Sequence, residues 1–115
     1  MLTRAEFEQI CSQWAGVSFV EQWDSYVAKV GGKVFGLKSE NGHGALSFKV
    51  RETSFEILTA MPKIAQAPYF AKRRWVSAAS DALSVEEFND YLKASYDLVG
   101  AGLTKKLQRT LGLIV

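Results

Sequence analysis

Two adjacent glycines between two strand-like runs are the feature that most constrains the fold of this chain. Residues 25–30 and 33–38 are rich in valine and aromatic residues and are interrupted by polar side chains, which is typical of β-strands. Gly31-Gly32 separates them, and a two-residue hairpin turn requires positive φ angles, which glycine adopts without steric cost. The sequence therefore predicts an antiparallel hairpin in which Lys29 pairs with Val34 and Ala28 pairs with Phe35.

Three capping boxes indicate where helices begin around this hairpin. In each, a Ser or Thr hydroxyl and a Glu carboxylate three residues later accept hydrogen bonds from backbone N–H groups at the helix start. The boxes lie at Thr3–Glu6, Thr53–Glu56 and Ser84–Glu87. Apolar residues recur at helical spacing after the first and third boxes, and we expect Gly100 and Gly102 to kink or break the third helix.

Further strand patterns complete the expected fold. Residues 45–50 alternate between apolar and polar, residues 74–79 also indicate a strand, and residues 63–72 are ambiguous between a short strand and a loop around Pro68. The expected order is α-β(3)-α-β(2)-α. This order predicts an α+β two-layer domain, with an antiparallel sheet of four to five strands and helices on one face. A length of 115 residues suits a single domain spanning residues 1–115.

Cysteine usage and apolar patterning exclude several protein classes. Cys11 is the single cysteine, so the chain can form neither an internal disulfide nor a Cys-rich metal site, which fits a reducing cytoplasm. No run approaches the roughly 18 apolar residues of a membrane span. The first residues are acidic and lack the apolar core of a signal peptide. We therefore expect a cytoplasmic protein without membrane association.

Residues that commonly carry catalysis or hold cofactors are sparse. His43 is the single histidine, lies between glycines in an expected turn, and has no catalytic or metal-ligating partner near it in the sequence. Cys11 falls on the apolar face of the first helix, where a small core residue is expected rather than a nucleophile. Gly31-Gly32 lacks the cradle and following helix of a phosphate loop. The sequence predicts neither an enzyme nor a cofactor.

Positive charge is concentrated in the middle of the chain. The net charge is +2, but residues 1–24 carry −3, residues 25–79 carry +6 and residues 80–115 carry −1. Successive side chains of a strand point to opposite faces. Alternation therefore predicts that Leu37 faces the helices, while the open face carries three lysines and no acidic residue in these strands. The three lysines are Lys29, Lys38 and Lys49.

Such a face is suited to the phosphates of nucleic acid, because lysines on rigid strands can displace counterions from the backbone. A solvated sheet face with no partner has the same pattern, and both interpretations stay open here. Arg51, Arg73 and Arg74 can extend the basic patch, and Arg73 and Arg74 can instead protect a strand edge from pairing. The longest expected helix is acidic, so binding is expected to be weak and largely independent of sequence.

The tryptophans allow two interpretations. Trp75 can stack on a base or ligand, but its place in a strand favours packing between sheet and helix. Trp14 and Trp23 are expected in the core or at its rim.

Four segments, in order along the chain, resemble the MmcQ/YjbR family. They are residues 29–35, residues 47–49, residues 68–70 leading into 72–76, and residues 95–99 with Leu103 and 105–107 behind them. The resemblance implies an α-β(3)-α-β(2)-α domain similar to type III secretion chaperones and loosely to bacterial frataxin (CyaY). It also implies DNA binding through a paired-hairpin, "double-wing" surface. Relatives often have His before Trp75, and this chain has Arg74 there, which weakens any shared histidine chemistry.

The chaperone-like fold favours a second class of function, that of a protein-interaction or adaptor domain. Such a domain is expected to present an exposed apolar surface to a protein partner or to a second copy of itself. The C-terminal residues that could form this surface are Leu107, Leu111, Leu113 and Ile114. A frataxin-like iron site would need an acidic ridge, which the first helix, with Glu6 and Glu8, lacks.

Overall fold

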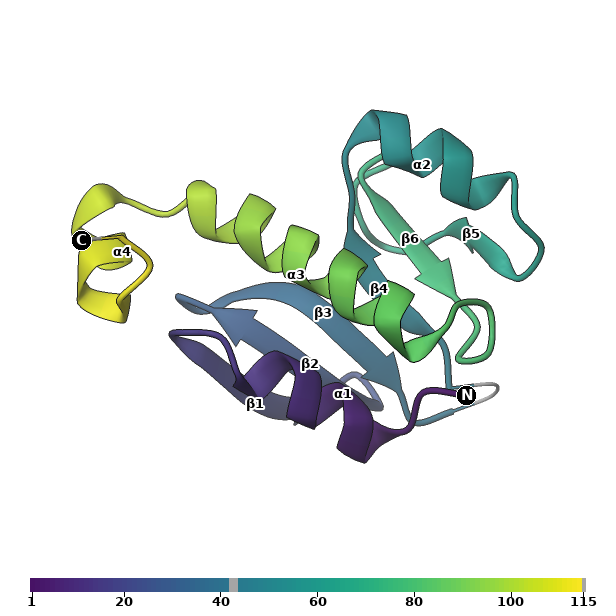
Figure 1. The fold of residues 1–115 in the computed structure, drawn as a ribbon, viewed down its shortest axis with the longest axis horizontal. Coiled ribbons are helices and arrows are strands. Elements are labelled where there is room, and N and C mark those ends of the chain that lie inside the picture. Colours follow the sequence, from purple (N-terminus) through teal and green to yellow (C-terminus); the bar gives the residue numbers. More distant parts are fainter. Residues whose placement is uncertain (42–43, 115) are drawn as a thin grey trace.

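The computed structural model describes residues 1–41 and 44–114, so His43 lies outside the described residues. The helices are α1 (Arg4–Ser12), α2 (Glu52–Thr59), α3 (Val85–Ala101) and α4 (Lys105–Leu111). The strands are β1 (Val17–Gln22), β2 (Ser25–Val30), β3 (Lys33–Ser39), β4 (Leu46–Lys49), β5 (Ile64–Gln66) and β6 (Trp75–Ala78). Figure 1 shows these elements as two layers, with α1 and α3 lying across the sheet.

The sheet is antiparallel throughout and has the strand order β1-β2-β3-β4-β6-β5. Helices α1 and α3 cover one of its faces and leave the other face open (Figure 1). The α+β class and the single helical layer are therefore confirmed. The sheet has six strands rather than the expected four to five.

Strand β1 is the element that the sequence patterns missed. It pairs with β2 along its whole length, and Glu21 faces Tyr26 across the two strands. Glu21 therefore lies on the helix-facing side, where an apolar residue would be typical, and its carboxylate pairs with Arg4 at the start of α1. This exposed carboxylate on the helix-facing side interrupts the apolar alternation that would have marked the strand.

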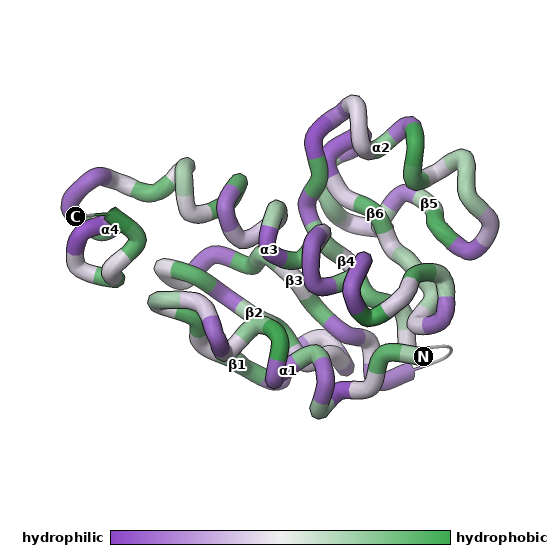
Figure 2. The backbone as a smooth tube through the Cα atoms, viewed as in Figure 1, coloured by the Kyte–Doolittle hydropathy of each residue, from purple (hydrophilic) through white to green (hydrophobic). Residues whose placement is uncertain are grey.

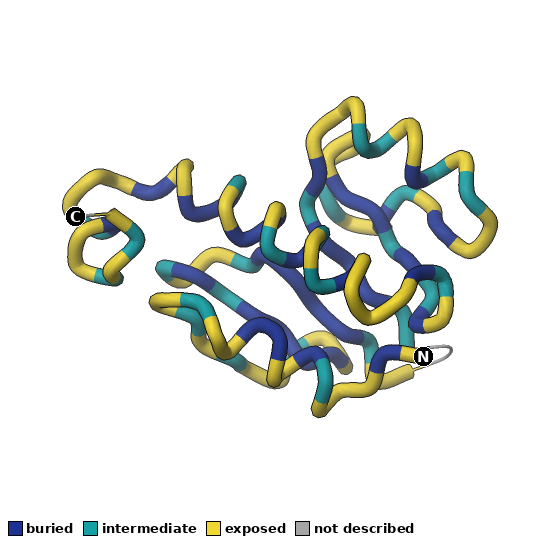
Figure 3. Tube along the Cα trace, viewed as in Figure 1, coloured by how far each residue is buried: buried dark blue, intermediate teal, exposed yellow. Residues whose placement is uncertain are grey.

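The core lies between the covered face of the sheet and the helices α1 and α3, and Leu58 of α2 adds to it over β5 and β6. Phe7 and Cys11 of α1, Phe88 and Leu92 of α3 and Phe48 of β4 are fully buried. Figures 2 and 3 show hydrophobic and buried residues along the central strands, while α3 alternates between exposed polar positions and buried positions toward the sheet. Burial of this continuous apolar layer is the main favourable contribution to folding.

Two of the three expected capping boxes are present, at Thr3–Glu6 before α1 and at Ser84–Glu87 before α3. The box expected at Thr53–Glu56 is wrong. Helix α2 begins earlier, after Arg51, with no side-chain hydrogen bond at its N-cap. The Val50 N–H still belongs to the sheet, donating to the Arg74 carbonyl at 2.7 Å, so the chain turns into the helix immediately afterwards.

The expected break near Gly100 and Gly102 is confirmed, since α3 ends at Ala101 and α4 begins after the N-cap Thr104. Helix α4 folds back onto the β2–β3 turn. A methyl group placed on Gly31 would lie 2.7 Å from Leu103 and 3.2 Å from Leu107, and its φ of 59° also favours glycine at this position.

The expected C-terminal apolar surface is therefore largely used within the chain. Leu107, Leu111 and Leu113 pack against the core, and Ile114 is 37% exposed. These leucines do not form the free patch on which an adaptor surface or a homodimer was expected.

Candidate nucleic-acid interface

A β-bulge in β3 decides which side chains reach the open face. Lys29 pairs with Val34 as expected, but Ala28 pairs with Gly36 rather than with Phe35, because the register shifts by one residue between Ala28 and Lys29. The extra residue turns both Phe35 and Gly36 toward the helices. A methyl group on Gly36 would lie 3.0 Å from Leu92 of α3 and 3.6 Å from Phe7 of α1, so this glycine also permits close helix packing.

The bulge reverses the two residues that follow it. Leu37 pairs with Ser47 and faces the open side, although alternation predicted it in the core. Lys38 pairs with Tyr26, whose ring packs edge-on against Phe7 in the helical layer. Placing Lys38 on the open face was therefore wrong.

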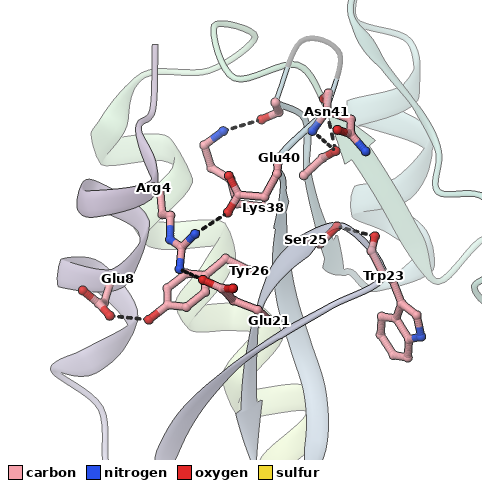
Figure 4. A network of polar contacts seen from close by, with 11 residues as sticks. Arg4, Glu8, Glu21, Trp23, Ser25, Tyr26, Lys38, Glu40 and Asn41 are labelled. Atoms are coloured by element: carbon pink, nitrogen blue, oxygen red, sulfur yellow. Dashed lines mark hydrogen bonds and ion pairs between the residues drawn. The ribbon is translucent and has the colours of Figure 1, made fainter.

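Lys38 is only 9% exposed, and its Nζ donates to the Gly44 carbonyl at 2.9 Å. Figure 4 shows it on the same side as the Arg4 network, with Trp23 extending away from that network. In this network Arg4 pairs with Glu21 and Glu40, and the Tyr26 phenol donates to Glu8, which raises the pKa of Tyr26. The network fastens α1 to the sheet and leaves Lys38 as a structural donor.

Lys29 and Lys49 do lie on the open face, on either side of the bulge. Both are partly exposed. The Lys29 Nζ lies 3.4 Å from the Gln22 amide oxygen, and neither lysine forms an ion pair with a carboxylate of the described residues. Since β3 separates their strands, their Cα atoms are at least about 10 Å apart, two regular strand spacings.

The open face is free of carboxylates across all six strands, each of which the structure describes in full. The registers place Ser18, Val20 and Gln22 of β1 on this face, in line with β2. Glu21, the one acidic residue within a strand, faces the helices. The acid-free face predicted for three strands is therefore confirmed and extends to the others.

The three arginines lie at the start of α2 and just before β6, and two of them are ion-paired. Arg73 pairs with Glu56 at 2.6 Å, and Arg74 approaches Glu52 at 3.6 Å, so both lean onto α2. The hydrogen bond from Arg73 to Glu56 raises the pKa of the Arg73 guanidinium. Arg51 is exposed at the start of the same helix. The structure therefore does not merge the six predicted residues into one patch.

A groove of about 590 Å³ crosses the open face. Its lining is formed by Trp23, Ser25, Leu37, Ser39, Ala45, Ser47, Pro68, Tyr69, Phe70 and Ser77. Neither lysine of the open face lines it: Lys49 lies two residues beyond the lining residue Ser47 on β4, and Lys29 lies four residues beyond Ser25 on β2. Trp23 is 65% exposed and Tyr69 is fully exposed, which differs from the core or rim position expected for Trp23. Sequence reasoning missed both residues, because Trp23 follows the unrecognised strand β1 and Tyr69 lies in the ambiguous segment.

Trp75 is buried, as its pattern favoured, but it packs on the open face and not between sheet and helix. It is 7% exposed on the open face, and the Phe70 ring stacks on it with centroids 4.1 Å apart and planes 20° apart. The residues between β5 and β6 are thereby held against the sheet and form one wall of the groove.

Other functional features are not evident in the part of the chain that the structure describes. No three His, Cys, Asp or Glu side chains gather there in a way that could hold a metal ion. None of the described helices combines the length and the apolar character needed to cross a membrane.

Comparison with known proteins identifies relatives. The chain is similar to Deinococcus radiodurans protein DR2400, described as a DUF419 domain, with 27% identity and a TM-score of 0.87 over 97% of this chain and 89% of that one. It shares its fold with a Pseudomonas syringae protein, with 18% identity and a TM-score of 0.68 over 84% and 98% of the two chains. No curated protein matches. The YjbR family model matches residues 12–98, and the chain belongs to the YjbR family.

Proposed function

We propose that this protein binds nucleic acid, DNA in the first instance, through the open face of its sheet. The observation that carries the proposal is the pair Lys29 and Lys49. Both lie on rigid strands, both lack an ion-pair partner among the described residues, and no carboxylate shares their face. An ammonium group in that setting can neutralise a backbone phosphate without first giving up an ion pair.

The expected affinity is low and independent of sequence. Two lysine–phosphate contacts predict a Kd toward the weak end of non-specific binding, on the order of 10⁻⁴ M at physiological salt. They also predict a slope of log Kobs against log salt near −2 for duplex DNA. A slope of about −4 or steeper would indicate that Arg51, Arg73 or Arg74 also reach the phosphates, after separating from Glu52 and Glu56.

A charge-reversal pair tests the proposal by fluorescence anisotropy with labelled duplex DNA. The double substitution Lys29→Glu and Lys49→Glu should abolish measurable binding. The matched control is Lys105→Glu with Lys106→Glu on α4, which changes the net charge equally at two exposed positions away from the open face. If both double variants bind equally well, or if wild-type binding is insensitive to salt, the open face is not the interface.

A further inference from the structure

Trp23 and Tyr69, which line the groove on the open face, are both exposed aromatic residues held in an unfavourable backbone conformation. Their φ angles are 55° and 69°. Trp23 and Asp24 form the two-residue turn between β1 and β2, and with φ of 54° at Asp24 the turn is of a type that strongly favours Asn-Gly. Bulky residues at positive φ are outliers, and such strain is concentrated where a side chain has a task.

The groove wall that carries Tyr69 is firmly positioned. Gln66 of β5 donates from Nε2 to the Ala67 carbonyl at 2.8 Å and accepts from the Arg73 N–H at 2.9 Å. These two hydrogen bonds connect the beginning and the end of the segment 67–74, and the stacking of Phe70 on Trp75 holds the segment against the sheet. Tyr69 therefore projects from a fixed wall, which reduces the entropy lost when a ligand packs on its ring.

The groove floor offers hydroxyl groups as well as apolar contact. Ser47 and Ser77 pair across β4 and β6, and neither hydroxyl has a hydrogen-bond partner among the residues that the structure describes. Leu37 pairs with Ser47 on the other side. Lys49 follows Ser47 by two residues on the same face, so its Cα lies about 7 Å further along the strand.

We infer that this groove binds single-stranded nucleic acid, with unpaired bases stacking on Trp23 and Tyr69 and the backbone phosphates on Lys29 and Lys49. The inference rests on the proposed function and specifies its substrate. Aromatic platforms beside a basic track are the usual means of holding single strands. In a duplex the bases are already stacked on one another, and their faces cannot reach the two rings.

An apolar peptide fits the same groove less well. Its apolar side chains would cover the Ser47 and Ser77 hydroxyls without forming hydrogen bonds to them, so that only its backbone could satisfy these groups. It would also make no use of the two ammonium groups. A nucleotide strand supplies base-edge donors and acceptors for the serines and a phosphate for each lysine.

The test compares fluorescently labelled oligothymidine with a duplex of mixed sequence by anisotropy. Wild-type protein should bind the single strand more tightly. Trp23→Asn and Tyr69→Asn should each weaken single-strand binding on the order of ten-fold, the loss expected for one base–aromatic stack. Duplex binding should stay unchanged in both variants. Asparagine adopts positive φ more readily than Trp or Tyr, so both variants should unfold at the wild-type temperature or above it.

Two controls separate stacking from general loss of apolar surface. Trp23→Phe keeps a ring and should retain most of the affinity. Ile57→Ala removes an apolar side chain that is 66% exposed on α2, outside the groove, and should change nothing.

The outcomes distinguish this inference from the proposed function. Equal affinity for single strand and duplex, with Trp23→Asn and Tyr69→Asn without effect, would overturn the groove inference and leave the phosphate-binding proposal standing. Absence of binding to either nucleic acid would overturn both. Tight binding of an apolar peptide that Trp23→Asn abolishes, without single-strand binding, would assign the groove to a protein ligand and also overturn the inference.

Discussion

Ser95 of α3 stands between Phe35 and Lys49 at the point where strands β3 and β4 part. Its hydroxyl donates to the Phe35 carbonyl at 2.5 Å and accepts from the Lys49 N–H at 2.9 Å, and the residue is fully buried. The β3–β4 ladder ends one pair earlier, at Gly36 and Phe48. The Ser95 hydroxyl thus satisfies the Phe35 carbonyl and the Lys49 N–H, which have no partner in the β3–β4 ladder. It also holds the backbone from which the Lys49 side chain extends.

Replacing Ser95 by alanine should therefore be costly. Both backbone groups would be left unpaired in the interior, and an unsatisfied buried group costs roughly 1–3 kcal/mol. We expect Ser95→Ala to lower the free energy of unfolding by about 2–4 kcal/mol, measured by urea denaturation. Ser12→Ala, which removes a hydroxyl on the exposed side of α1, is the matched control and should change stability by less than about 0.5 kcal/mol.

Gly36 should not tolerate a larger residue. A methyl group there would press on Leu92 at 3.0 Å, and overpacking of a filled core costs roughly 1–3 kcal/mol. We expect Gly36→Ala to lower the free energy of unfolding by that amount. Adding Leu92→Ala should make the combined loss smaller than the sum of the two single losses, because the truncated side chain makes room. Strict additivity in this double-mutant cycle would contradict the proposed contact.

The thiol of Cys11 should be inert in the folded protein. The residue is fully buried in the core, and burial raises the pKa of the thiol well above its usual range, so the reactive thiolate is scarce. Modification by a disulfide reagent at neutral pH should proceed only in denaturant, or at the rate at which the native protein unfolds. Rapid labelling under native conditions would show that α1 detaches from the sheet.

Acid should destabilise the fold through two surface carboxylates. Hydrogen bonds from the Thr3 backbone and side chain lower the pKa of Glu6, and a hydrogen bond from Lys63 lowers that of Asp81. A carboxylate whose pKa is lower in the folded state stabilises the protein above its unfolded pKa, about 4, and loses this contribution as pH falls through the lower folded value.

The melting temperature should therefore decrease as the pH is lowered below about 4. Glu6→Gln should make this decrease shallower than in the wild type, and the measurement is thermal unfolding followed by circular dichroism across the acidic range. The exposed Glu86→Gln on α3, for which no comparable hydrogen bond exists among the described residues, is the control and should leave the profile unchanged.

The fold was predictable where local chemistry is explicit. The Gly31-Gly32 turn, the capping boxes at Thr3 and Ser84 and the break near Gly102 each follow from residues that act on their immediate neighbours. The predicted alternation of side chains along β4 is also observed, and Lys49 lies on the open face as expected.

The parts that could not be predicted depend on contacts distant in the sequence. Glu21 lies on the helix-facing side of β1, where it pairs with Arg4 of α1, so local apolar alternation does not mark β1 as a strand. The bulge in β3 follows from helix packing over Gly36 and from Ser95, which lies sixty residues further along the chain. Trp23 and Tyr69 line one groove although they are distant in the sequence.

The bulge in β3 has a consequence for comparing relatives. Removing one residue at the bulge would reverse the facing of the residues that follow it, so that Lys38 would point to the open face and Leu37 toward the helical layer. Members of the family with the same number of lysines in this strand can therefore differ by a full positive charge on the open face. A sequence alignment that ignores this one inserted residue would assign the lysine charge to the wrong face of the sheet.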